Sequence, residues 1–166
     1  MPLVSVSTPD TIRWIIENSK ENDVILSTPF YSTEICAYTG RPIVLHPKYE
    51  TKEIRDKIMR FANTLFGDSE DDFYKLCKEW SVAYFIFPKS TYTSNNEYSW
   101  RYFTDKLEFD ENSLALKFEA LPVAAEYENK GRYQISVSTG FDKPNLKYFD
   151  LIYQNKEFNI YKVKPR

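Results

Sequence analysis

The sequence predicts an α/β fold in which a short parallel sheet is covered by helices in a three-layer-like arrangement, followed by an α+β part with antiparallel strands. Residues 1–88 alternate capped amphipathic helices with short apolar strands, an order that favours parallel strands joined by right-handed crossovers. Residues 89–166 begin with a polar stretch and continue with alternating apolar and polar positions. Because 166 residues with 42% hydrophobic content can build one core, we expect residues 1–166 to form a single domain.

Cap residues and apolar spacing define the elements of the first half. Thr8 and Ser69 are N-cap candidates, whereas Gly40 and Gly67 follow predicted helices. Between these signals, apolar residues recur at helical spacing or form short runs. The expected elements are a helix from Thr8, a strand over 23–27, a helix over 32–38, a strand over 42–45, a helix over 52–66, a helix from Ser69 and a strand over 82–87.

The second half is expected to be mainly β. Residues 88–99 are polar and lack periodicity, which predicts a long loop and a second candidate contact surface. Alternation of apolar and polar residues predicts strands over 114–118 and 133–137. The apolar positions of 149–153 and 158–163 predict a terminal antiparallel hairpin.

The only histidine, His46, lies in residues 41–55, which read RPIVLHPKYETKEIR. Residues 42–45 are apolar and the segment ends in helical spacing, so it reads as a strand-to-helix turn. Ligands of α/β proteins usually bind at such turns, beyond the carboxyl ends of strands. His46, Tyr49 and Glu50 are therefore binding candidates.

A structural interpretation of the same residues stays open. His46 and Glu50 can satisfy backbone groups of the turn, while Arg41 and Arg55 pair with carboxylates. Under the binding interpretation, Arg41 and Arg55 belong to the candidate site. A third hypothesis is a small enzyme in which His46 and Glu50 exchange protons, or in which Cys36 pairs with His46, but no orienting group or nucleophile is identifiable.

Trp100 and Arg101 follow the polar stretch and complete the candidate set. Aromatic residues at this place either anchor the chain in the core or contact a carbohydrate or a partner. A free-standing binding module would use these residues together with the turn at 41–55.

The string over 41–55 resembles the C-terminal soluble part of the tryptophan C-mannosyltransferases, polytopic membrane glycosyltransferases of the GT-C type. Nine residues match the pattern R-P-I-V-x-H-P-x-Y-E-x4-R, and the likeness extends more loosely over residues 23–88. In that family the sugar-donor site and the catalytic carboxylate belong to the membrane-embedded part. The resemblance implies a non-catalytic extracytoplasmic domain that supports the fold of a larger protein or helps to recognise an acceptor.

The same resemblance implies the partners. They are the membrane-embedded part of the same polypeptide and a glycan or peptide acceptor, and the donor of the parent enzyme is a polyprenyl-phosphate-linked sugar. No cofactor is expected for this domain. The net charge of −2, with acids and bases intermixed, offers no basic field for nucleic acid. Since no apolar run approaches the ~20 residues that cross a bilayer, the sequence as given is expected to be soluble.

Cys36 and Cys77 belong to no zinc-binding pattern, and both lie on apolar faces of predicted helices. We expect them to be buried free thiols, with a disulfide possible in an oxidising compartment. No glycine-rich phosphate loop, nucleophile elbow or H-E-x-x-H pair is present, so common nucleotide-binding and hydrolase classes lose support. No residue is assigned as catalytic or metal-binding.

Overall fold

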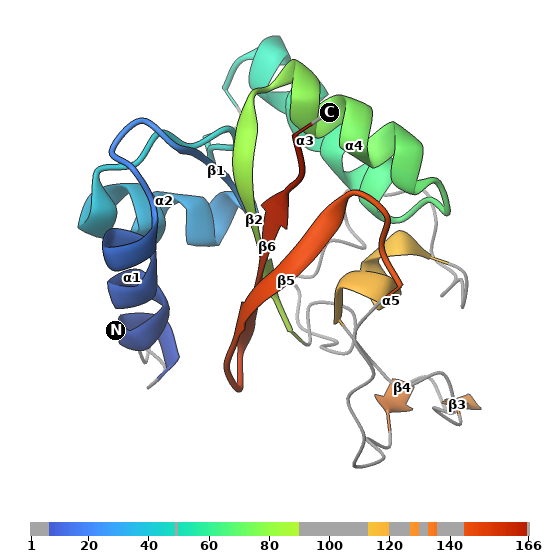
Figure 1. Cartoon of the computed structure of the whole chain (residues 1–166). Coiled ribbons are helices and arrows are strands. Elements are labelled where there is room, and N and C mark those ends of the chain that lie inside the picture. The colour runs from blue at the N-terminus through green and yellow to red at the C-terminus, as the bar shows by residue number, and fades with distance from the viewer. Residues whose placement is uncertain are drawn as a thin grey trace.

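The computed structural model describes residues 7–48, 50–89, 113–119, 127–129, 133–135 and 145–165. Helices and strands follow the alternating order expected from the sequence (Figure 1). The helices are α1 (Ser7–Asn18), α2 (Pro29–Thr39), α3 (Lys52–Leu65), α4 (Glu70–Glu79) and α5 (Leu114–Glu119). The strands are β1 (Val24–Leu26), β2 (Val82–Pro88), β3 (Tyr127–Asn129), β4 (Tyr133–Ile135), β5 (Phe149–Gln154) and β6 (Phe158–Val163).

The main sheet has the strand order β1-β2-β6-β5 and combines both pairing modes. β1 and β2 are parallel, as predicted for the first half, whereas β6 runs antiparallel to both β2 and β5. The predicted terminal hairpin is confirmed as β5 and β6, and it adds to the same sheet instead of forming a separate one. β3 and β4 form a second, two-stranded antiparallel sheet.

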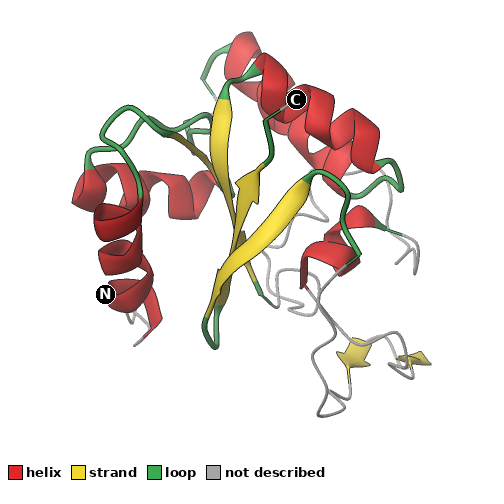
Figure 2. Cartoon of the chain, in the orientation of Figure 1, coloured by secondary structure: helices red, strands yellow, loops and turns green. Residues whose placement is uncertain are grey.

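Helices cover both faces of the main sheet (Figure 2). α1 and α2 lie on one face, where Ile15 and Ile35 pack on Ile86 and Ile160. α3, α4 and α5 lie on the other face and enclose the larger, aromatic part of the core. The mixed α/β class and the layered arrangement predicted from the sequence are therefore confirmed.

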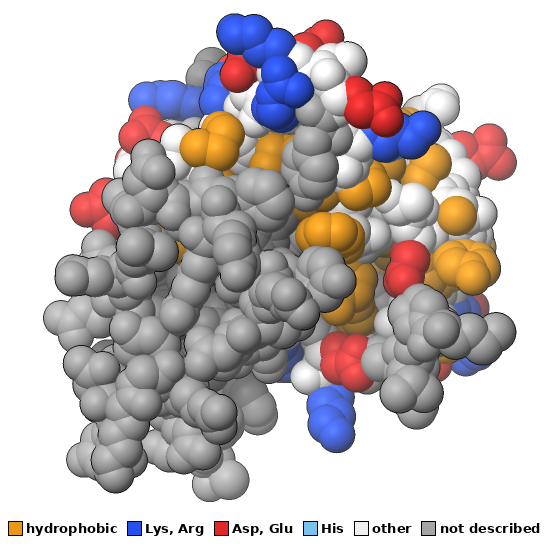
Figure 3. Space-filling model, turned by 180° about the vertical axis from the view of Figure 1, so that it is seen from behind, with side chains coloured by type: hydrophobic (Ala, Val, Ile, Leu, Met, Phe, Trp, Pro, Cys, Tyr) orange, Lys and Arg blue, Asp and Glu red, His pale blue; other side chains and the backbone are white. Residues whose placement is uncertain are grey.

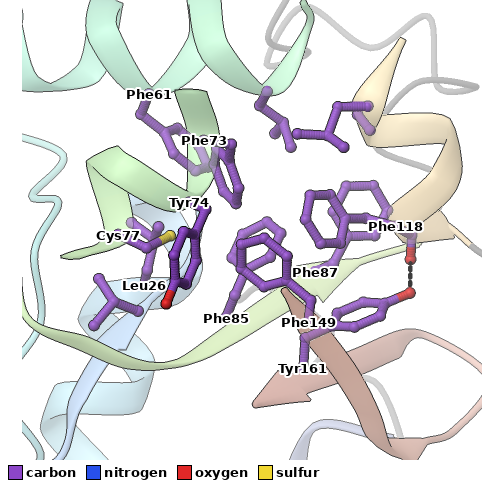
Figure 4. Packing of buried hydrophobic residues seen from close by; sticks show 14 of the residues in the cluster. Leu26, Phe61, Phe73, Tyr74, Cys77, Phe85, Phe87, Phe118, Phe149 and Tyr161 are labelled. Atoms are coloured by element: carbon purple, nitrogen blue, oxygen red, sulfur yellow. Dashed lines mark hydrogen bonds between the residues drawn. The ribbon is translucent and has the colours of Figure 1, made fainter. Parts of the chain in front are cut away.

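Alternation along β2 and β6 divides the core between the two faces. Phe85 and Tyr161 point toward α3 and α4, whereas Ile86 and Ile160 point toward α1 and α2. On the aromatic side, Phe73 of α4 is central (Figure 4). Its ring centroid lies 5.1 Å from that of Phe85, 5.2 Å from Phe118 and 5.6 Å from Phe149. Aromatic rings at these distances attract one another beyond simple burial.

Helix ends agree with the sequence signals at three of four positions, Gly40, Gly67 and Ser69. Gly40 caps α2 with φ 68°, a left-handed conformation that glycine adopts without strain, and Ser69 Oγ accepts a hydrogen bond from the Asp72 amide at 3.2 Å. α1 begins at Ser7, so Thr8 lies inside that helix and is not its N-cap. α3 ends at Leu65 with Phe66 as its cap, just before Gly67.

Two predicted strands are wrong. Residues 42–45 contribute only one isolated parallel bridge, between Ile43 and Ile25, because Pro42 and Pro47 limit the amide donors available to a ladder. Residues 114–118 form helix α5. Leu114 and Phe118 are four residues apart, a spacing that serves a helix face as well as a strand face, and leucine and alanine favour the helix.

The strand expected over 133–137 is confirmed as β4 for Tyr133–Ile135, and the loop expected over 88–99 lies outside the described residues from Ser90 onward. Among the helices that the structure describes, none is both long and apolar enough to cross a bilayer.

Candidate functional site

Arg41 is buried, with 9% of its surface exposed, and serves as a brace. Its Nε donates to Ser19 Oγ at 3.1 Å, and its Nη2 donates to the Ile16 and Ser19 carbonyls at 3.3 and 2.9 Å. Nη1 donates to the Thr39 carbonyl at 2.9 Å. The guanidinium therefore satisfies carbonyls at the end of α1, where a positive charge is favourable, and joins α1 to the end of α2.

The segment after Arg41 runs along β1 and is held at both ends. The Ile25 amide donates to the Pro42 carbonyl at 2.9 Å, and Leu45 is fully buried in the aromatic-side core. At the other end, Thr51 Oγ1 accepts from the Ile54 amide at 3.2 Å and begins α3. Because Ile43 pairs with Ile25 in parallel, the segment points toward the carboxyl end of β1, the edge predicted for it.

Between these anchors, His46 and Glu50 are exposed. His46 makes no hydrogen bond within the part of the chain that the structure describes, and the carboxylate of Glu50 makes no ion pair there. The Glu50 carbonyl accepts from Arg55 Nη1 at 3.3 Å. The Arg55 side chain thus links the end of the segment to the first turn of α3.

The predicted candidates are only partly brought together. Arg41 donates to a hydroxyl and to backbone carbonyls and not to a carboxylate as expected, whereas Arg55 contacts the backbone of Glu50. No hydrogen bond joins His46 to Glu50 or to Cys36 in the described ranges. Tyr49, Trp100 and Arg101 lie outside the described residues.

The two cysteines differ. Cys77 is a buried free thiol, as predicted, and burial raises its pKa. Cys36 is free but exposed, so the prediction that it is buried is wrong: it lies on the outward side of α2, a helix with one charged residue, Glu34, in 11. In the described ranges, no three His, Cys, Asp or Glu side chains are grouped so as to hold a metal ion.

Two clusters were not predicted from the sequence. The ring of Trp14 on α1 lies 5.4 Å from that of Tyr153 and 6.1 Å from that of Tyr84, and all three are half-buried. Under α5, the Phe118 carbonyl accepts hydrogen bonds from Tyr161 Oη at 2.5 Å and from Asn159 Nδ2 at 2.9 Å. Partners in both clusters are far apart in sequence, so only the aromatic content of the chain hinted at them.

The sequence model of the family described as "Dpy19: Q-cell neuroblast polarisation" matches residues 4–163. The C-mannosyltransferases dpy-19 of Caenorhabditis elegans and Caenorhabditis briggsae are each 32% identical over 84 residues, or 49% of this chain. That segment covers 12% of the length of either relative.

Solved structures show the same fold. A crystal structure of the C-terminal globular domain of oligosaccharyltransferase from Archaeoglobus fulgidus matches with a TM-score of 0.65 and 13% identity, over 96% of this chain and 98% of that one. A second structure described as the same kind of domain, also from Archaeoglobus fulgidus, matches with a TM-score of 0.54 and 14% identity, over 98% of both chains. The resemblance carried by residues 41–55 is thus confirmed and extends well beyond residues 23–88: this chain belongs to the Dpy19 family.

Proposed function

We propose that this chain is the non-catalytic, extracytoplasmic globular domain of a membrane-embedded glycosyltransferase. The observation that carries the proposal is the family match over residues 4–163, since the curated members that align with the chain bear the name C-mannosyltransferase. The fold adds support, because it is that of a C-terminal globular domain of oligosaccharyltransferase. The partner of this domain is the membrane-embedded remainder of the same polypeptide.

The domain supports the fold of the larger protein or helps to recognise its acceptor. The turn at residues 46–50 suits recognition, because it presents an imidazole and a carboxylate to solvent from a frame fixed by Leu45 and Thr51. A preformed frame lowers the ordering cost of binding. The donor, a polyprenyl-phosphate-linked sugar, is bound by the membrane-embedded part.

Sugar transfer by separated parts tests the proposal. Transfer from a polyprenyl-phosphate-linked sugar to an acceptor peptide is measured for the full-length polypeptide that carries this domain, for the same polypeptide without it, and for the isolated chain. We expect the full-length polypeptide to transfer the sugar. The polypeptide without this domain should show a lower transfer rate or a lower abundance, and the isolated chain should transfer no sugar. Turnover by the isolated chain contradicts the proposal, as does a deletion that changes neither rate nor abundance.

Substitutions in the turn test acceptor recognition separately. His46→Ala and Glu50→Ala should weaken binding of a glycan or peptide acceptor to the chain while the melting temperature stays unchanged, since both side chains are exposed. Glu53→Ala is the matched control, because its carboxylate is 79% exposed on the neighbouring first turn of α3. Unchanged affinity in both turn variants leaves the domain with a supporting role only.

A further inference from the structure

We draw no further inference here: the strongest candidate, the half-buried aromatic cluster of Trp14, Tyr84 and Tyr153 where α1 meets the main sheet, packs against the core beneath it, and nothing in the structure shows what covers it, as is also true of the hydrophobic side chains that lie among charged ones on the face in Figure 3.

Discussion

Replacing Arg41 distinguishes a brace from a binding residue. Arg41→Ala removes four hydrogen bonds from the guanidinium, which connect the end of α1 with the end of α2. The carbonyls of Ile16, Ser19 and Thr39 then lose a donor in a place where Arg41 itself is only 9% exposed. We expect a large loss of stability and no direct loss of ligand affinity.

The size of the effect follows from these contacts. A hydrogen bond to a charged group contributes about 1.5 kcal/mol or more, and a cation at a helix C-terminus adds about 0.5 kcal/mol. Bonds made by one side chain act together and water reaches part of the space that the arginine leaves, so the total is less than the sum. We expect a loss of roughly 3 to 5 kcal/mol, a large share of the ~5–15 kcal/mol that stabilises a typical domain.

Urea unfolding followed by far-UV circular dichroism measures this loss. Arg41→Lys keeps the charge but not the planar fork, so it should recover part of the stability. Arg13→Ala is the control, since Arg13 is 69% exposed and lies 3.8 Å from Asp10, and it should cost roughly 0.5 kcal/mol or less. If the free energy of unfolding of Arg41→Ala lies within about 1 kcal/mol of that of the natural chain, Arg41 does not stabilise the contact between α1 and α2 and is again a candidate for ligand binding.

Three further predictions concern single positions. Gly40→Ala should cost about 1 kcal/mol in urea unfolding, because φ is 68° and no atom lies within 4 Å of an added Cβ, whereas Gly40→Asn should cost less; equal losses would contradict backbone strain as the cause. Tyr161→Phe should cost about 1 kcal/mol and speed amide exchange in α5, because the Phe118 carbonyl keeps only the Asn159 donor; unchanged exchange would show that the hydroxyl does not hold α5. Burial raises the pKa of Cys77, so above about pH 8.5 the unfolded thiol loses its proton before the folded one and stability falls. The fall should be smaller in Cys77→Ala, and an identical pH profile in that variant would exclude this thiol as its source.

Much of the helical layer could be predicted because its signals are local. Ile58, Phe61 and Leu65 form the buried stripe of α3, and Ser69 begins α4 within the same few residues that predict it. The two wrong strands had weaker signals. A run of four or five residues fits a strand and a helix equally well, and tertiary contacts decided: the Leu114 amide donates to the Gly67 carbonyl at 2.7 Å and starts α5 against the end of α3.

The site was harder to predict than the fold. Arg41 reads as a ligand-binding arginine in its own segment, but three of its four hydrogen bonds reach residues 22 to 25 positions earlier, and its partners are mainly backbone carbonyls, which any residue type supplies. The burial of Cys36 was predicted wrongly for a related reason. An apolar helix normally predicts enclosure, and no local pattern tells which side of α2 the rest of this chain leaves open.

The place of β6 in the sheet affects how the chain is made. β6 comes after β5 in the sequence, yet it lies between β2 and β5, so β2 has no second neighbour until Phe158–Val163 have left the ribosome. During synthesis the edge of β2 is therefore open to pairing with other chains, as unpaired strand edges are. A chain that stops before Phe158 would lack a central strand of the sheet, and such a product should be degraded and not merely shortened.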